Sequence, residues 1–571
     1  MKEGGFEGAR MSIAWSRIYP EGDGDEPNAE GVQHYHDVID ALLDRGLEPM
    51  ITLYHWDLPQ ALEDKYGGWL NASIVPIFNA YADTCFKEYG GKVKKWLTIN
   101  EPWSFVHHGY STGVHAPGRS ALEMCRSFCD QGDSFTEPYI AGHNVLNAHA
   151  KAVYTYRTKY KAEQGGEIGI TLNCDWGMPL DPHSQEDKET AMRYVDFQLG
   201  WWADPIYFGD YPSSMRDRIG MRLPVFTEEE RTFLVGSNDF FGLNHYTSWY
   251  LTDIPGSTPP REGTSPAKAL AANISLPVTS PGDGWAQDMG GIQTKADLNG
   301  VINGVLGETD WLTVVPAGFR PLLKLVSTRY GHPIIMVTEN GMDRAGESNL
   351  PVEEAVEDVE RQKYYQGYIE SMVAAMMEDA VDVRGYYAWS ILDNFEWSDG
   401  YRPRFGLTYV DYENGLKRTP KDSWKWFAKL AVARRDYRRR QNTHDGDIHG
   451  ESEDDSADGS EDDSGDNSGR DSSHIEDSGP DGLDSSDDEP ATVGMAAEDG
   501  AGAEQDLAVG VPEGPVSREE QAVGETPTGL ITLCLALGVV LAGVGFGLGK
   551  YNVQRGKPRY EEMRESPAPG W

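Results

Sequence analysis

Short apolar runs alternate with longer amphipathic stretches from residue 5 to about residue 430. Parallel strands need a long crossover between each pair, and amphipathic helices supply it, so this alternation predicts an α/β fold with a parallel sheet. The stretch 31–45 has apolar residues at helical spacing and is typical of a covering helix. The predicted strands are 9–14, 48–53, 96–100, 168–172, 240–244, 334–339 and 385–389.

Four regions of different composition follow one another along the 571 residues. Residues 1–440 contain the alternating pattern and form the predicted folded domain. Residues 441–527 are rich in Asp, Ser, Gly and Glu, which cannot bury enough apolar surface to offset chain entropy, so they predict a disordered acidic stalk. Residues 528–549 are an uncharged apolar run, and residues 550–571 are a short tail that begins with basic residues.

The apolar run 528–549 has the length that crosses a bilayer, about 20 residues, and is predicted to be a transmembrane helix. Lys550, Arg555 and Lys557 follow the run, whereas acidic residues precede it. The positive-inside rule then places the C-terminus in the cytosol and the folded domain in the lumen or outside the cell. Possible glycosylation sites at Asn71 and Asn273 favour the same side.

The charge of the chain argues against a nucleic-acid partner. The formal net charge is −42, more than half of it in the acidic stalk, whereas phosphate binding needs concentrated Lys and Arg. The five cysteines show no paired spacing typical of zinc ligands; Cys125 and Cys129 either pair within a loop or stay reduced. The histidines His107, His108, His143 and His149 lack neighbours at metal-ligand spacing. We therefore expect neither a metal nor a cofactor.

Two glutamates stand directly after predicted strands. Glu101 follows the run 96–100 and Glu339 follows the run 334–338. The carboxyl ends of parallel strands meet at one edge of a barrel, where active sites lie, so the two side chains are expected to face one cavity. Cleavage of a glycosidic bond requires such a pair, one carboxyl to protonate the leaving oxygen and one to stabilise the anomeric centre.

Longer motifs surround both glutamates. They are WSRIYP at 15–20, YHWDLPQ at 54–60, TINEP at 98–102, TEPY at 136–139, VTENG at 337–341 and WSILDNFEW at 389–397. In this order the motifs resemble glycoside hydrolase family 1 over residues 1 to about 431. The resemblance implies a (β/α)8 barrel, with Glu101 as acid/base and Glu339 as nucleophile about 5 Å apart.

The resemblance also assigns supporting residues. Arg10 would hold the nucleophile ionised, and Asn244 and Tyr246 would support the nucleophile, with His245 in place of a more usual Tyr. The glycone, the sugar whose bond is cleaved, would be bound by His55, Asn100, Trp389, Glu396 and Trp397. The carboxylate of Glu396 would repel a phosphorylated sugar and so favours a neutral hexose.

The resemblance begins directly before what would be the second strand of the family barrel. We therefore expect a barrel that lacks its first strand and helix, and seven strands would leave two parallel edges open. Residues 1–8 contain no export signal, although the predicted topology needs one. A missing front end would account for both absences; the alternative is a tail anchor with the barrel in the cytosol.

The predicted function is hydrolysis of β-glucosides or related neutral β-glycosides, with retention of configuration, through a covalent glycosyl-enzyme. One alternative is a membrane-tethered binding or receptor module of the same fold, which the presence of both carboxylates disfavours. A second alternative is a transglycosidase, which needs the same residues and differs only in how its site excludes water.

Overall fold

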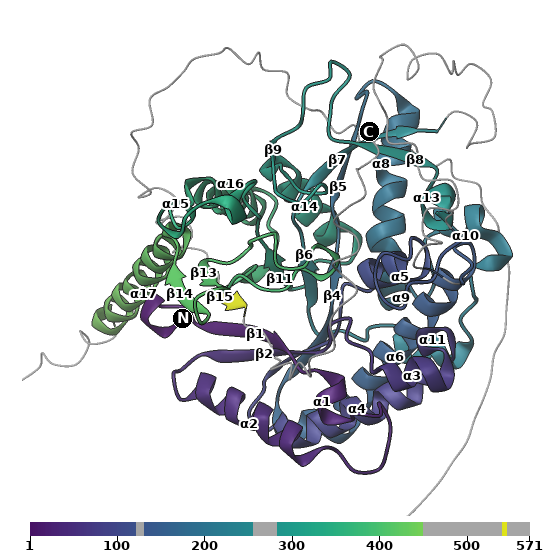
Figure 1. Ribbon diagram of the computed structural model, residues 1–571, viewed down its shortest axis with the longest axis horizontal. Coiled ribbons are helices and arrows are strands. Elements are labelled where there is room, and N and C mark those ends of the chain that lie inside the picture. Colours follow the sequence, from purple (N-terminus) through teal and green to yellow (C-terminus); the bar gives the residue numbers. More distant parts are fainter. Residues whose placement is uncertain (122–128, 130, 255–282, 449–539, 545–571) are drawn as a thin grey trace, which may run out of the picture. The chain divides into compact units, whose positions relative to one another are not determined.

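A closed barrel of eight parallel strands forms the centre of the computed structural model (Figure 1). The structure describes residues 1–121, 129, 131–254, 283–448 and 540–544. Around the barrel the strands follow the order β1-β15-β12-β11-β6-β4-β3-β2. Their bounds are β1 (Gly8–Ser12), β2 (Glu48–Tyr54), β3 (Lys95–Asn100), β4 (Glu167–Asn173), β6 (Phe241–Asn244), β11 (Ile335–Asn340), β12 (Val383–Ala388) and β15 (Val540–Val544).

Each of the seven predicted strands coincides with a strand of this barrel, with ends that differ by a few residues. The (β/α)8 barrel expected from the sequence is therefore confirmed. The covering helix expected at 31–45 is α2 (Ala29–Leu43), which lies between β1 and β2 in the chain. Its buried residues Tyr35 and Ile39 lie one turn apart, as helical spacing requires.

The open seam expected between the first and last predicted strands is not present. β15 fills it and pairs in parallel with β1 on one side and with β12 on the other. Five residues of the run 528–549, which we expected to be a transmembrane helix, are thus an extended strand, and the rest of the run lies outside the described residues. The physical reason is that two open parallel edges expose unpaired backbone groups, which an uncharged strand can satisfy on both sides.

No helix in the described part of the chain is long and apolar enough to cross a bilayer. The last helix, α17 (Asp422–Ile448), continues into the first residues of the segment predicted to be a disordered stalk, so the boundary expected at residue 440 falls inside a helix. The chain divides into two units, Met1–Asn442 with Pro527–Trp571 and Thr443–Thr526. Most of the predicted stalk, residues 449–527, and the tail 550–571 lie outside the described residues.

Helices connect the barrel strands and cover their outer faces (Figure 1). The longer ones are α4 (Ile74–Tyr89), α6 (Glu137–Lys159), α8 (Gln185–Val195), α14 (Phe319–Arg329) and α16 (Val359–Glu378). The shorter ones are α1 (Trp15–Ile18), α3 (Gln60–Tyr66), α5 (Pro102–Tyr110), α7 (Lys161–Gln164), α9 (Trp201–Phe208), α10 (Ser213–Ile219), α11 (Glu228–Leu234), α13 (Gly284–Met289) and α15 (Val352–Ala355).

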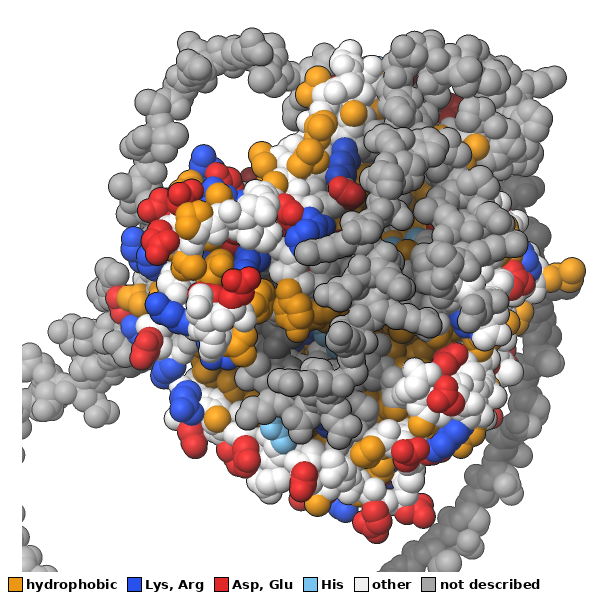
Figure 2. Space-filling view, viewed as in Figure 1, with side chains coloured by type: hydrophobic (Ala, Val, Ile, Leu, Met, Phe, Trp, Pro, Cys, Tyr) orange, Lys and Arg blue, Asp and Glu red, His pale blue; other side chains and the backbone are white. Residues whose placement is uncertain are grey.

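Small sheets extend from the loops of the barrel. One is three-stranded, with the order β5-β7-β8, and two are two-stranded, β10-β9 and β13-β14. Their bounds are β5 (Trp176–Pro179), β7 (Ser248–Asp253), β8 (Gly291–Thr294), β9 (Val305–Leu306), β10 (Thr313–Val314), β13 (Thr408–Asp411) and β14 (Lys417–Pro420). On the face that Figure 2 shows, acidic and basic side chains are interspersed where described residues are visible.

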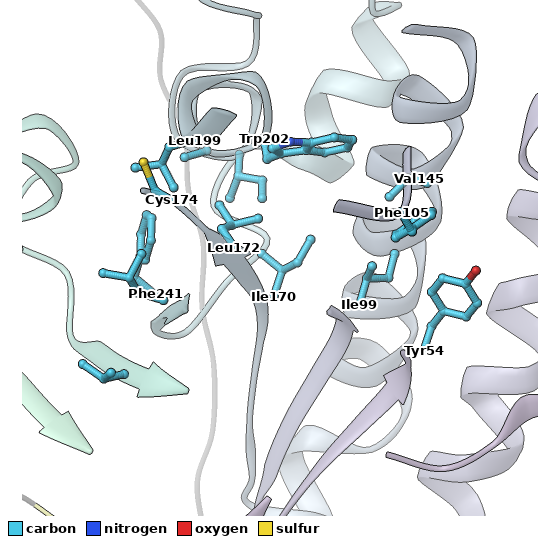
Figure 3. Packing of buried hydrophobic residues seen from close by; sticks show 14 of the residues in the cluster. Tyr54, Ile99, Phe105, Val145, Ile170, Leu172, Cys174, Leu199, Trp202 and Phe241 are labelled. Atoms are coloured by element: carbon cyan, nitrogen blue, oxygen red, sulfur yellow. The ribbon is translucent and has the colours of Figure 1, made fainter. Parts of the chain in front are cut away.

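The hydrophobic core has two parts. The larger part lies between the strands and their covering helices, where Ile170 and Leu172 of β4 pack near Trp202 of α9 (Figure 3). The smaller part includes Met50, Leu97, Met336 and Tyr387, which come from four different strands of the barrel. Because the barrel interior is itself packed, the open end of the barrel is left for chemistry.

Candidate active site

Glu101 and Glu339 lie at the carboxyl ends of β3 and β11, where the sequence placed them. Both strands have a register irregularity next to these residues, between Leu97 and Asn100 and between Val337 and Asn340. Such irregularities redirect side chains and are common beside active sites.

The backbone of Glu101 is in the left-handed region, with φ of 43°. This conformation is rare for a residue with a side chain and costs of order 1–3 kcal/mol. Pro102 begins α5 directly afterwards, with its φ suited to a first helical turn. Trp56 and Trp397 also have positive φ, at 74° and 51°, so backbone strain is concentrated around this site.

The carboxylate of Glu339 is buried and is held by two donors. A guanidinium nitrogen of Arg10 on β1 pairs with Oε1, and the hydroxyl of Tyr246 donates to Oε2 at 2.6 Å. Arg10 and Glu339 are 1% and 3% exposed. A positive charge and a hydroxyl that donate to the same carboxylate in a buried site stabilise its anionic form.

The carboxyl of Glu101 has a different environment. Asn244 donates to its Oε1 at 2.6 Å, and Ser104 donates to its Oε2 at 2.8 Å. Burial raises the pKa of Glu101 to about 8, and the nearby charge of Glu339 adds to the rise. Glu101 is thus protonated at neutral pH while Glu339 has a cation as its partner. Two carboxyls in opposite environments are the requirement for acid and nucleophile roles in one site.

Asn100, at the end of β3, contacts both Arg10 and His55. Its Oδ1 accepts a hydrogen bond from Arg10, and its Nδ2 lies 3.0 Å from Nε2 of His55. Burial and the charge of Arg10 hold the pKa of His55 well below its usual range. A neutral imidazole and an amide are therefore available to bind the hydroxyls of a sugar.

The remaining predicted glycone residues lie in the loop after β12. The indole nitrogen of Trp389 donates to Oε1 of Glu396 at 3.3 Å. The ring of Trp397 stacks on His55, with centroids 5.6 Å apart, and lies 4.4 Å from the ring of Trp56. Burial raises the pKa of Glu396 to about 8. Aromatic faces and a carboxyl beside them form a surface on which a sugar ring can stack and bind through its hydroxyls.

One predicted role differs from the geometry. We expected Asn244 to support the nucleophile, but its amide group donates to Glu101 and its Oδ1 accepts from the hydroxyl of Thr338. In the barrel order β6 lies between β11, which contains Glu339, and β4, beyond which β3 leads to Glu101; the amide of Asn244 reaches across to the β3 side. His245 points elsewhere: its Nδ1 bonds the carbonyl of Cys174, and its ring stacks on Phe319.

The structure adds residues that sequence reasoning did not single out. Ser104 and Asn173 form a chain of hydrogen bonds to Glu101. Trp311, 39% exposed, lies edge-on to the ring of Tyr246 at 5.5 Å. Trp56 donates its indole hydrogen to the carbonyl of Asn100. The only signal for Ser104 was its position three residues after Glu101, which matches an ordinary helix start equally well.

Two of these histidines lie close to acidic side chains, which the sequence did not indicate. Nε2 of His107 is 3.1 Å from a carboxylate oxygen of Asp283, and His143 is 3.5 Å from Glu230. Among the described residues no group of three or more possible ligands is arranged to hold a metal ion. Cys129 is disulfide-bonded, whereas Cys85 and Cys174 are free and buried.

A parallel barrel that ends in two such carboxyls, one protonated and one paired with arginine, defines a retaining glycosidase. Comparisons with known proteins agree. Residues 1–435 match the family model of glycosyl hydrolase family 1. β-Glucosidase 6 of rice is 45% identical over 434 residues, which are 75% of this chain and 78% of the relative. β-Glucosidase 40 of Arabidopsis thaliana is 45% identical over 434 residues, 75% and 80% of the two chains.

Solved structures give the same result. The rice Os3BGlu6 β-glucosidase in a covalent complex with glucose has a TM-score of 0.69 and 44% identity, over 75% of this chain and 85% of that chain. A β-glucosidase of the fungus Humicola insolens in complex with glucose has a TM-score of 0.68 and 45% identity, over 76% and 85% of the two chains. The chain belongs to glycosyl hydrolase family 1, and it is a retaining β-glucosidase.

Proposed function

We propose that Glu101 is the acid/base and Glu339 the nucleophile of this β-glucosidase. The observation that carries the assignment is the contrast between their surroundings. Glu339 receives donors from Arg10 and Tyr246, whereas the pKa of Glu101 is raised to about 8. A nucleophile must be ionised when substrate binds, and an acid must still hold its proton.

The reaction then takes two steps. Glu339 attacks the anomeric carbon while Glu101 protonates the departing oxygen, which leaves a glucosyl ester on Glu339 and an alcohol. In the second step Glu101, now ionised, removes a proton from water, and the water displaces the ester with a second inversion. The first step removes the negative charge of Glu339, which had helped to raise the pKa of Glu101, so Glu101 becomes easier to ionise when it must act as a base.

The assignment is tested with 4-nitrophenyl β-glucoside and proton NMR of the first-formed sugar. The protein should release β-glucose first, and Glu339→Gln should lower kcat by at least about 10⁴-fold. The exposed Glu353 provides the matched control, and Glu353→Gln should keep full activity. If Glu339→Gln retains the wild-type rate, Glu339 is not the nucleophile.

Glu101 is tested separately. Glu101→Gln should lose about 10²–10⁴-fold in kcat/KM on substrates with a poor leaving group, because that step needs an acid. An activated dinitrophenyl glucoside should still form the glucosyl-enzyme, which then accumulates and is detected by mass spectrometry of the intact protein. Equal losses on both substrates would contradict the acid/base role.

The glycone is proposed to be a neutral hexose, with glucose as the expected sugar because the two related structures above contain it. His55, Asn100, Trp389, Glu396 and Trp397 are the proposed glycone residues. Glu396 supports the choice: as a partly buried carboxyl it can bond sugar hydroxyls, and it offers no positive charge to a phosphate. A 6-phosphoglucoside should be hydrolysed at least about 100-fold more slowly than the neutral glucoside.

Transglycosylation remains a second proposed activity of the same residues, since an alcohol can replace water in the second step. Trp311 favours it modestly, because an exposed aromatic ring next to Tyr246 can stack an acceptor. Reactions with added primary alcohols should yield alkyl β-glucosides in competition with glucose. A constant glucose yield at all alcohol concentrations would exclude this activity.

The barrel is proposed to act in the lumen or outside the cell. Two observations support this: Cys129 is disulfide-bonded, which is typical of oxidising compartments, and the possible glycosylation site at Asn71 is exposed. In a eukaryotic host, glycosidase digestion should then increase the gel mobility of the protein, and Asn71→Gln should remove at least part of that shift. A protein that carries no glycan would argue for the cytosol.

The membrane anchor at 528–549 is also a proposal, and it competes with the barrel for the same residues because Val540–Val544 form β15. Alkaline carbonate extraction distinguishes the two uses. An anchored protein stays in the membrane pellet with its tail, residues 550–571, on the cytosolic side, whereas a protein that uses the segment as a strand is released.

A further inference from the structure

Two asparagines at neighbouring strand ends are connected to Glu101 by hydrogen bonds, one directly and one through Ser104. Asn173 is the last residue of β4 and Asn244 the last of β6, and the register of the barrel pairs them. Asn244 donates directly to Oε1 of Glu101 at 2.6 Å. Asn173 donates to the hydroxyl of Ser104 at 3.1 Å, and Ser104 donates to Oε2 at 2.8 Å. The acid/base carboxyl is thus held on both oxygens.

The direction of the hydrogen bonds from Asn173 through Ser104 to Glu101 follows from which of these groups can donate and which can accept. A serine hydroxyl has a single hydrogen and can either donate it to a carboxyl or accept the proton of that carboxyl. The amide nitrogen of Asn173 can only donate, so it occupies an acceptor position of the Ser104 oxygen. Asn173 fills one of the two acceptor positions of this oxygen, so the hydrogen of Ser104 is available for donation to Oε2 of Glu101 at 2.8 Å.

The local fold keeps Ser104 in this position. It lies in the first turn of α5, three residues after Glu101, and its backbone nitrogen donates to the carbonyl of Glu101 at 3.0 Å. Its side chain is in a residue only 6% exposed, so bulk water cannot replace either partner freely. The backbone nitrogen of Glu101 in turn bonds the carbonyl of Thr171 on β4, which fixes the two strand ends together.

We propose that Ser104 is a positioning residue for the acid/base, kept as a donor by Asn173, and that this donor sets how tightly Glu101 holds its proton. The inference rests on the proposed role of Glu101. A donor aimed at a carboxyl favours the ionised form, and it opposes the burial that favours the neutral form. Ser104 and Asn244 thus prevent the acid from becoming too weak to protonate a leaving group, and they stabilise the base that the second step requires.

The test measures the alkaline limb of the kcat/KM profile for an aryl β-glucoside, which reports the ionisation of the acid in the free enzyme. Ser104→Ala should move this limb upward by about one pH unit, because a hydrogen bond to a charged group is lost. Ser104→Thr keeps the hydroxyl and should restore the wild-type limb. Asn173→Ala, which frees the hydroxyl to rotate, should give a smaller upward shift.

A hydroxyl elsewhere on the same part of the chain provides the control. Thr112 follows α5, and its hydroxyl donates to the carbonyl of His108. Thr112→Ala should leave the limb unchanged. An unmoved limb in Ser104→Ala would overturn the proposal, and so would a downward shift, which would mean that Ser104 accepts the proton of Glu101.

A direct titration separates this inference from the proposed function. Carbon-13 NMR of protein labelled at the glutamate carboxyls, with the Glu101 signal identified by its loss in Glu101→Gln, gives the ionisation of Glu101 without any substrate. The signal should titrate at higher pH in Ser104→Ala than in the wild type, even if the wild type fails to hydrolyse the glucoside. If Ser104→Ala does not fold, Ser104→Cys, a near-isosteric and weaker donor, should show an intermediate shift; no shift would contradict the proposal.

Discussion

The hydroxyl of Tyr246 lies 2.6 Å from Oε2 of Glu339, the oxygen that does not face Arg10. Tyr246 follows the end of β6, and its backbone carbonyl accepts hydrogen bonds from Tyr364 and Tyr368 of α16. The side chain is therefore held in place from a covering helix behind it. With Glu339 as the proposed nucleophile, this hydroxyl would stabilise its charge before attack and again when the glucosyl ester is displaced.

Removal of this hydroxyl should slow the enzyme without unfolding it. Tyr246→Phe should lower kcat/KM by about 10–100-fold, which corresponds to the 1.5–3 kcal/mol of a hydrogen bond to a charged group. Steady-state kinetics on an aryl β-glucoside provide the measurement. The half-exposed Tyr154 is the matched control, and Tyr154→Phe should have the wild-type rate. A loss below twofold in Tyr246→Phe would contradict the role.

The alkaline limit of activity should follow Glu101. Burial and the charge of Glu339 raise its pKa to about 8, so the protonated, active form predominates below that pH and is lost above it. A plot of kcat/KM against pH should thus fall with a midpoint near pH 8. Mutation of the exposed Glu353 to Gln should not change the midpoint. If kcat/KM of the wild type instead falls near pH 5, the pKa of Glu101 is that of an ordinary carboxyl.

Most of the barrel could be predicted from the sequence because buried parallel strands are continuous apolar runs that stand out from amphipathic helices. The run 334–339 shows this: four uninterrupted apolar residues lead to Thr338 and Glu339, and the strand is found at Ile335–Asn340. The sequence did not predict β15. Uncharged apolar residues are equally suited to a bilayer and to a buried strand, and only the presence of two open edges distinguishes the uses.

The site could be predicted in part for a similar reason. Glu101 and Glu339 stand at strand ends, and strand ends of a barrel face one cavity whatever the helices do. The partner of Asn244 could not be predicted, because adjacency around the barrel does not say which neighbouring carboxyl a short side chain reaches. Ser104 and Asn173 are 69 residues apart, and no local pattern indicates that they form a hydrogen bond.

The partly buried carboxyl of Glu396 should lower the stability of the folded protein at high pH, although it is proposed to bind the substrate. Burial raises its pKa from 4.5 to about 8. Between these values the unfolded chain releases a proton that the folded protein retains, so the free energy of unfolding falls as the pH rises from 4.5 to 8. Glu396→Gln has no such proton and should have a higher Tm than the wild type at pH 8, with little difference at pH 4.5.

The same substitution should weaken glucose binding, because an amide replaces the carboxyl that is proposed to bind the sugar. Thermal unfolding at both pH values and KM for the glucoside test the two halves together. A difference in Tm that does not depend on pH would show that Glu396 titrates normally in the folded protein.

A buried group of six charges lies behind the loop that contains Glu396. Lys421, fully buried, is 2.9 Å from Asp393 and 2.5 Å from Glu347. Arg361 pairs with Glu347 and Asp358, and Arg404 pairs with Asp393. The three cations and three anions balance in this group, and they connect the loops after β11 and β12 to the starts of α16 and α17.

Loss of one cation from this group should be costly. Lys421→Met leaves two buried carboxylates without their shared partner, and a broken buried pair typically costs about 3–5 kcal/mol. Denaturant unfolding measures the loss, and KM should rise because Asp393 belongs to the same loop as Glu396 and Trp397. Lys417→Met, at an exposed lysine four residues earlier, should change the free energy of unfolding by less than about 0.5 kcal/mol. Equal stability of the two variants would show that the pairs contribute nothing.

The closure of the barrel by β15 gives the last prediction. β15 pairs Ala9 of β1 with Gly543 and Gly385 of β12 with Val540, so its removal exposes unpaired backbone groups on both neighbouring strands. A chain that ends at residue 526 should therefore have a Tm at least about 4 °C lower than a chain that ends at residue 548. Amide hydrogen exchange should be faster specifically in β1 and β12, because these two strands lose their shared neighbour. Arg10 belongs to β1 and holds Glu339, so the shorter chain should also lose activity. If the two chains have the same Tm, exchange rates and kcat, then β15 does not stabilise the barrel, and the segment is free to serve as a membrane anchor.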